Sequence, residues 1–320
     1  MALGTDGIIV GDVPNFIPEL WSDEVVASYK SNLVAANLVR KLNHRGKKGD
    51  TVKIPTPTRG EAATKALTGN AQVTLIAHGT DTGLTVSIDQ HKEYSRFIED
   101  IVDVQALESL RRFYTDDGGY AIAKQVDSAL LVEFFNTAAA TINYTYSSNT
   151  IATTSTFGTI YEGDGTAWDE AGTTDLSDAG IRAHIKILDD GDVPFSERFY
   201  VVPTIVKQDL TGLPRFTEEA FVGERAGANT IRNGIVGNVY GVDVYVTTRT
   251  PLVEDGLATA DNVSAFLFQR DAMLLIEQLG VRSQTQYKQE YLADLFTVDM
   301  IYGRKLLREG SVVPIVVPTT

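Results

Sequence analysis

The chain has 320 residues, of which 43% are hydrophobic and 22% are charged, a composition typical of a folded globular protein with one large or two modest domains. It contains no cysteine, which excludes disulfides, thiolate metal sites and cysteine nucleophiles and fits a reducing cytoplasm. Its net charge of −14 argues against a dedicated nucleic-acid-binding protein, because such a surface repels phosphate. Residues 1–10 lack a basic residue, and no apolar run approaches 18 residues, so neither a signal peptide nor a membrane span is predicted.

The first part of the chain predicts an arm followed by a helix. Residues 1–14 are rich in glycine and are expected to be extended. Ser22 is a suitable N-cap for a helix, because apolar residues then recur at helical spacing, at Val25, Tyr29, Leu33 and Ala36. This helix should end before the basic, glycine-containing turn at 44–50.

From Thr51 the apolar residues recur at every second position, which predicts a strand at 51–54 that two prolines should stop. A second alternating stretch follows at 84–89. The residues between these strands, from Arg59 to Gly83, are polar and small and offer little to a core. The pattern therefore predicts a projecting β-hairpin that needs a neighbour to lie on.

A long helix is predicted next, because one apolar face runs from Phe97 to Leu110 and resumes from Ile122 to Phe134, ending near Thr137. The sequence Asp-Asp-Gly-Gly at 116–119 predicts a kink or short break, since each internal glycine costs about 1 kcal/mol relative to alanine. Residues 141–174 are rich in threonine, serine, glycine and tyrosine and predict strands and loops.

The remaining segments mix helices and strands. Helices are expected at 176–188, with Asp175 or Ser177 as N-cap, at 204–210, and after residue 268 through Leu279. Strands are expected at 199–202 and 264–268, in a hairpin at 234–247, and in a closing antiparallel pair at 291–302 and 312–317. This order predicts an α+β fold and not a doubly wound sheet.

No pattern of catalytic or metal-binding residues emerges. The histidines at 44, 78, 91 and 184 lack a metal-ligand spacing and are expected to be solvated. There is no nucleophile elbow and no P-loop; the glycines and lysines at 46–49 precede a strand and predict a basic hairpin turn. The acidic clusters at 162–170 and 189–192 lack the calcium-loop pattern and predict solvated turns. We therefore expect no catalytic, cofactor-binding or metal-binding residues.

Six segments in a fixed order carry a resemblance to a known family. They are FIPELWS at 16–22, GDTVKIP at 49–55, LTVSID at 84–89 followed by HKE at 91–93, AIAKQVDSALL at 121–131, GVDVYV at 241–246, and YGRKLLRE at 302–309 with VV at 312–313. Together they resemble the major capsid proteins of tailed bacteriophages with the Hong Kong 97 type fold.

The resemblance implies how the chain is divided. It implies an α+β capsid fold with an N-terminal arm at 1–49, an extended β-hairpin loop at 50–95, a peripheral domain with a spine helix at 96–140, an unassigned insertion or loop at 141–175, an axial domain at 176–288, and closing strands of the peripheral domain at 289–320. Some capsids of this family crosslink a lysine to an asparagine. Lys65 in the loop is the candidate lysine, and no partner asparagine stands out.

The family also implies partners and a location. Such proteins self-assemble through pentamers and hexamers into an icosahedral shell, the virion capsid, which is built in the host cytoplasm. A scaffolding protein, a portal and, in some shells, a decoration protein are the expected partners. DNA is enclosed without sequence-specific binding, and no membrane is involved.

Two alternatives remain open at this point. The first keeps the fold and makes the chain an encapsulin-like nanocompartment shell protein. The second is a soluble α+β enzyme, a hydrolase or transferase whose site is built from scattered residues. An electron micrograph of the purified protein would separate shells and capsomers from small particles.

Overall fold

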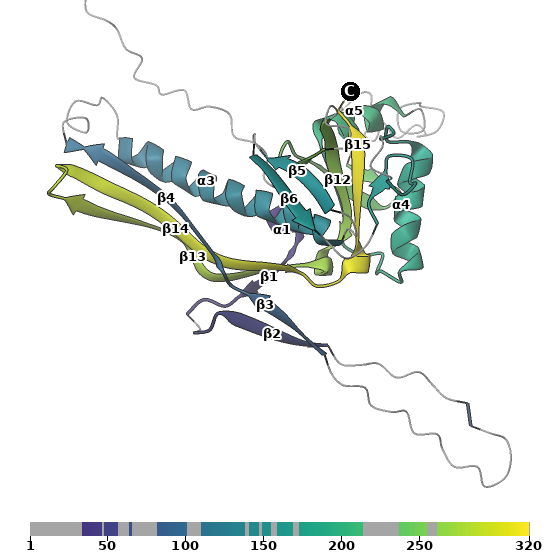
Figure 1. Ribbon diagram of the computed structural model, residues 1–320, viewed down its shortest axis with the longest axis horizontal. Coiled ribbons are helices and arrows are strands. Elements are labelled where there is room, and N and C mark those ends of the chain that lie inside the picture. The colour runs from purple at the N-terminus through teal and green to yellow at the C-terminus, as the bar shows by residue number, and fades with distance from the viewer. Residues whose placement is uncertain are drawn as a thin grey trace, which may run out of the picture.

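The structure is a computed structural model that describes residues 34–46, 48–56, 64–65, 82–100, 110–137, 141–146, 149–154, 159–168, 173–213, 237–254 and 261–319. Figure 1 shows an elongated lobe, in which one long helix lies along long strands, and a compact lobe at one end of it. A two-stranded hairpin lies below the junction of the two lobes in this view (Figure 1).

The elongated lobe is a four-stranded sheet covered on one face by a helix. The strand order is β1 (Arg40–Asn43), β13 (Met273–Lys288), β14 (Ala293–Leu306) and β4 (Gln90–Glu99), and only β1 runs parallel to its neighbour. Helix α3 (Leu110–Glu133), extended by a 3-10 turn (Phe134–Thr137), packs on it. Alternate residues of β14 point into this core, namely Phe296, Val298, Met300 and Tyr302.

The compact lobe contains a nine-stranded sheet. Its main path is β6 (Asn149–Thr154), β5 (Thr141–Tyr146), β11 (Leu252–Glu254), β12 (Asp261–Gln269), β8 (Arg198–Val202), β10 (Val242–Val246) and β9 (Asn238–Val239). Strand β15 (Val312–Pro318) pairs with β12 and with β7 (Tyr161–Glu162). Helices α4 (Asp178–Asp190) and α5 (Thr204–Gly212) contribute to its core.

Strand β15 is buried on both faces because it separates two cores. Val313, Ile315 and Val317 join the cluster that includes α4 and α5. Val312 and Val316 join the cluster around α3. Each face therefore has its own apolar partner, which explains the nearly continuous apolar run at 312–317.

Several predicted elements are confirmed. The hairpin strands at 51–54 and 84–89 are β2 (Thr51–Thr56) and β3 (Thr82–Ser87), which pair antiparallel. Ser177 caps α4, because its Oγ accepts a hydrogen bond from the backbone N–H of Gly180 at 3.0 Å. Strands β8, β10 and β12 and helix α5 also lie where the sequence predicts them, and residues 141–146 and 149–154 form strands. Pro55 does not stop β2 but lies within it, opposite Gly83.

The N-terminal helix prediction holds for residues 35–38 and is wrong for the residues that follow. Residues 1–33 lie outside the described part. Only a short helix, α1 (Ala35–Leu38), follows, and Val39 is extended with φ −96° and ψ 161°. Residues 40–43, predicted helical, form β1, because they pair with Leu274–Glu277 at the edge of the long sheet.

The long helix does not include Phe97 and does not break at 116–119. Phe97 lies in β4, which pairs with β14 along its whole length. Residues 101–109 lie outside the described part, and α3 then continues through both glycines. A side chain at Gly118 would lie 2.9 Å from the ring of Tyr94 and 3.0 Å from Val298. Glycine therefore allows close packing of helix on sheet.

Two further predictions near the C-terminus are wrong. The helix expected through Leu279 is strand β13, because the apolar run at 273–276 is buried between β1 and β14. The two closing strands are present but do not pair with each other. Strand β14 pairs with β13 and β4, and β15 pairs with β12 and β7.

Candidate assembly surfaces

Helix α3 connects the two lobes, and two of its polar residues form hydrogen bonds to other segments. The backbone N–H of Ala36 donates to Oδ1 of Asp127 at 3.1 Å, which fixes α1 on the helix. Asp127 is fully buried, and burial raises its pKa. Arg249, which follows β10, donates to the hydroxyl of Ser128 at 3.0 Å. The helix thus fixes both the incoming chain and the compact lobe.

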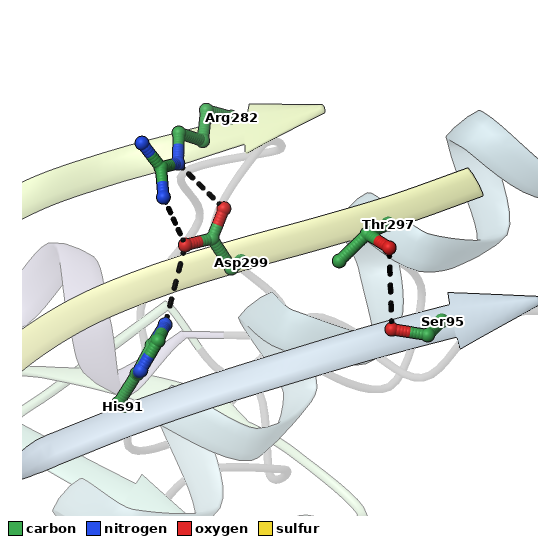
Figure 2. Close-up of polar contacts among 5 residues, drawn as sticks. All are labelled: His91, Ser95, Arg282, Thr297 and Asp299. Carbon is green, nitrogen blue, oxygen red and sulfur yellow. Dashed lines mark hydrogen bonds and ion pairs between the residues drawn. The ribbon is translucent and has the colours of Figure 1, made fainter. Parts of the chain in front are cut away.

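The face of the long sheet opposite α3 carries a polar network (Figure 2). Arg282 of β13 donates to both carboxylate oxygens of Asp299 in β14, at 2.7 and 2.9 Å. His91 of β4 lies 3.2 Å from the same carboxylate. The hydrogen bonds from Arg282 hold the pKa of Asp299 below its usual range, although partial burial opposes them. The carboxylate therefore links three strands of the sheet.

The hairpin base is anchored on the elongated lobe of the same chain. Val86 and Ile88 form a small apolar cluster with Leu274 and Ile276 of β13. A side chain at Gly303 of β14 would lie 2.4 Å from the carbonyl oxygen of Ser87, so glycine is needed where β3 crosses the sheet. Lys305 donates to the carbonyl of Thr85 at 3.1 Å. The position of the hairpin base is therefore set by the fold of the elongated lobe.

The far end of the elongated lobe exposes large apolar side chains. Four of them lie where β4 ends and where β13 turns into β14, and their exposed fractions are 55% for Phe97, 46% for Tyr287, 65% for Tyr291 and 66% for Leu292. The rings of Phe97 and Tyr291 lie 5.3 Å apart. The hydroxyl of Tyr287 donates to Asp100 at 2.9 Å. Clustered exposed aromatic groups are typical of protein interfaces.

His184 corrects the expectation that all four histidines are solvated. It lies in α4, is fully buried, and its Nε2 donates to the carbonyl of Glu162 at 2.9 Å. Burial lowers its pKa to about 4, so the ring is neutral near pH 7. His91 is 59% exposed, His44 lies in the turn after β1, and His78 is outside the described part.

The acidic clusters contribute to turns and one buried ion pair. Gly191 caps the C-terminus of α4, and Asp189 lies 2.6 Å from the buried guanidinium of Arg198. Asp164 accepts hydrogen bonds from the backbone and hydroxyl of Thr166, which lower its pKa; residues 169–170 are not described.

Within the described ranges, no group of three or more histidine or acidic side chains could hold a metal ion. Over the same ranges, no helix is long and apolar enough to cross a membrane.

Comparison with known proteins gives the fold a context. No protein-family model matches the chain, and no curated protein does. Several solved structures match over nearly the whole chain. A chain of Mycobacterium phage Che8 is 25% identical, with 94% of this chain and 97% of that chain covered and a TM-score of 0.68.

Two other matching solved structures come from phage capsids. A chain from the capsid structure of cyanophage P-SCSP1u is 17% identical, with 96% and 95% coverage of this chain and that chain and a TM-score of 0.73. A chain from the mature capsid of bacteriophage PhiM1 is 14% identical, with 95% and 93% coverage and a TM-score of 0.70. The predicted α+β fold of the phage capsid type is thus confirmed.

Proposed function

We infer that the chain is a major capsid protein of a tailed bacteriophage, a structural component of an icosahedral shell and not an enzyme. The observation that carries this inference is the likeness to phage capsid chains over more than nine-tenths of both partners. Because the two lengths match so closely, no large part of the chain is left for a separate catalytic domain. The chain works in the virion capsid as one of many identical copies.

The surfaces described above suit this function. The hairpin leaves the subunit from an anchored base, and a two-stranded hairpin is marginal alone. The segment 57–81 that connects its strands has four large apolar residues, Leu67, Val73, Leu75 and Ile76, too few for a core of its own, so its backbone groups need partners from a neighbouring subunit or water. The aromatic groups at the far end of the elongated lobe also need a cover. We propose that neighbouring subunits in a capsomer supply both the partners for this segment and the cover for the aromatic groups.

The lobes can be assigned to the domains of a capsid subunit. We propose that the elongated lobe is the peripheral domain, with α3 as its spine helix, and that the compact lobe is the axial domain. In this assignment β13 joins the peripheral domain, because it pairs with β14 over most of its length. The hairpin β5–β6 joins the axial domain, because β5 pairs with β11.

We further propose the partners that such a shell requires. A scaffolding protein guides closure, a portal occupies one vertex, and DNA is enclosed without sequence-specific contacts, in keeping with the net charge of −14. A decoration protein is an additional candidate. Synthesis and assembly take place in the host cytoplasm, where a chain without cysteine needs no oxidising compartment.

Electron microscopy and sedimentation of the purified protein test the function. We expect closed shells or capsomers of uniform size, with or without an added scaffolding protein. A strictly monomeric species across salt concentration and pH would contradict the proposal. Shells that copurify with an enclosed enzyme, and that form without scaffold or portal, would favour the encapsulin-like alternative instead.

A further inference from the structure

A strongly basic segment lies at the base of the hairpin. Residues 40–53 contain six lysines and arginines and a single acidic residue, within a chain whose net charge is −14. Arg40 and Arg45 make solvent-exposed ion pairs with Asp271 and Glu277, at 3.6 and 2.9 Å. Lys48 and Lys53 are also exposed. We call residues 40–53 the basic segment.

The opposite end of the elongated lobe has the complementary chemistry. Four carboxylates lie in the same two segments as its exposed aromatic groups, namely Glu99, Asp100, Glu290 and Asp294, and Lys288 is the one lysine among residues 287–294. Glu99, Asp100 and Glu290 are exposed. We call residues 97–100 and 287–294 the acidic tip. Carboxylates beside aromatic rings form a surface that binds lysine and arginine, through ion pairs and cation–π contacts.

The two surfaces cannot meet within one chain. The basic segment begins in β1, which pairs with Leu274–Glu277 at the start of β13, whereas the acidic tip follows Lys288 at its other end. The intervening strand spans about 35 Å at roughly 3.3 Å per residue, and Figure 1 shows the two ends far apart. Neither surface can therefore cover the other within one subunit.

The charge of the chain also indicates which molecule binds the two surfaces. Copies with a net charge of −14 repel one another, and a contact between a basic surface of one copy and an acidic surface of the next opposes that repulsion. Nucleic acid could neutralise the basic segment, but it cannot cover the acidic tip. A second copy of this chain accounts for both surfaces at once.

We propose that the basic segment of one copy binds the acidic tip of a neighbouring copy in the shell, a contact that rests on the proposed function for its setting. The contact is heterologous, since different surfaces of the two copies meet. Such contacts propagate from copy to copy and close into rings when the rotation between copies permits. The proposed contact also places lysine and arginine side chains over the aromatic groups of the tip.

Charge reversal tests the contact. In Lys48→Glu/Lys53→Glu the basic segment loses four units of charge, and in Glu99→Lys/Glu290→Lys the acidic tip gains four. Each double variant alone should assemble at least about tenfold less well than the parent at low salt, because like charges then meet. A mixture of the two should recover assembly, because each variant meets opposite charges on the other. All four changes in one chain should also recover it.

A matched control separates local pairing from net charge. Lys186→Glu/Lys207→Glu changes the charge by the same amount on α4 and α5 of the compact lobe and should assemble like the parent. Thermal midpoints of the free subunits check that every variant folds. Association is followed by sedimentation of small oligomers, which does not require a closed shell, so recovery on mixing supports the contact even if the parent forms no shells.

Two outcomes would overturn the proposal. If Lys48→Glu/Lys53→Glu assembles as well as the parent but its shells contain less DNA, the basic segment binds nucleic acid instead. If both double variants fail to assemble and neither mixing nor the fourfold variant restores association, the two surfaces do not pair with each other. Failure of the parent alone to form shells would instead count against the capsid function.

Discussion

At the scale of single residues, Gly118 and Gly119 are adjacent glycines with different structural roles in the same helix. Glycine inside a helix costs about 1 kcal/mol relative to alanine, yet α3 continues through both positions. At Gly118 an added side chain would lie 2.9 Å from Tyr94, whereas at Gly119 nothing lies within 4 Å. The sequence shows both glycines and cannot show which one faces the sheet.

This difference predicts opposite effects of the same substitution. Gly118→Ala should lower the stability of the subunit by roughly 1–3 kcal/mol, because the extra methyl group forces Tyr94 and Val298 away from the helix. Gly119→Ala should raise it by up to about 1 kcal/mol, because the helix gains propensity without a clash. Thermal or urea unfolding of free subunits measures both. Equal effects at the two positions would contradict the packing of α3 described above.

His184 predicts a pH dependence with a definite sign. Its folded-state pKa of about 4 lies below the ordinary value near 6.5, so between these values the unfolded chain binds a proton that the folded chain does not. Stability should therefore fall as the pH decreases from about 6.5 to 4, by about 3 kcal/mol in total from this residue. Above pH 7 the contribution should be constant.

Urea unfolding of free subunits at pH 7 and pH 4.5 measures this effect. His184→Gln keeps a donor for the carbonyl of Glu162 and removes the titrating ring. The variant should lose less stability than the parent between the two pH values, whatever its stability at pH 7. Identical losses would show that acid sensitivity arises from other groups.

At the scale of elements, the apolar face of the long helix from Ile122 to Phe134 is predicted to pack against the closing strands around Phe296, Val298 and Val313. The structure confirms this contact in part. Ile122, Val126, Leu130 and Phe134 lie in one cluster with Phe296 and Val298 of β14. Val313, which was expected in the same core, faces the other cluster, and its neighbour Val312 takes its place. The prediction is displaced by one residue along β15, and a shift of one residue exchanges the two faces of a strand.

Phe134 should be critical to this core. It is fully buried, and its ring lies 4.4 Å from that of Phe268 and 5.3 Å from that of Phe266. Phe134→Ala should cost about 3–5 kcal/mol, a large part of the roughly 5–15 kcal/mol that holds most domains together, and should yield insoluble subunits.

Lys124→Ala, earlier in the same helix, is the control and should leave the subunit folded, acting, if at all, on assembly. Soluble yield and thermal midpoint decide between the two variants. A stable Phe134→Ala with an unfolded Lys124→Ala would show that the wrong face of the helix was assigned to the core.

Elements were predicted correctly where the signal is local. The N-cap at Ser177 and the alternation at 51–54 depend only on adjacent residues, and both predictions hold. Strand β13 was missed because a short buried apolar run fits a helix or a strand equally well. Its partner residues, 293–306, come later in the chain. Strand β4 was missed for a different reason: Ile98 is its one buried residue, and only its pairing with β14 identifies it as a strand.

At the scale of the whole molecule, the sequence contained part of the candidate assembly surfaces. The basic turn at 44–50 is visible as a run of residues, and it lies in the basic segment. The aromatic cluster at the tip was not foreseen, because Phe97 and Tyr291 are nearly 200 positions apart and their contact depends on the pairing of β4 with β14. Exposure of an apolar residue is a property of the fold and not of the residue.

The segment 57–81 allows a prediction for the assembled particle. Trypsin should cleave at Arg59 or Lys65 in free subunits, since the segment has too few large apolar side chains to form a core that protects it. In assembled shells the same bonds should be protected if the segment lies on a neighbouring subunit. Time courses of cleavage, followed by mass spectrometry, measure the ratio of the two rates. Equal rates would exclude the segment from the subunit interface.

The position of β15 has a consequence for how the protein is made. Residues 312–317 are buried between both cores, and their pairing with β12 leaves that strand with a bare edge until they arrive. A ribosome must therefore translate through Val317 before either lobe can close. We expect that a chain ending before residue 312, which lacks the strand on which both cores pack, does not fold stably and so does not enter a growing particle and leave a hole in it. The same late requirement delays the folding of every complete copy, because contacts that are distant in sequence form slowly.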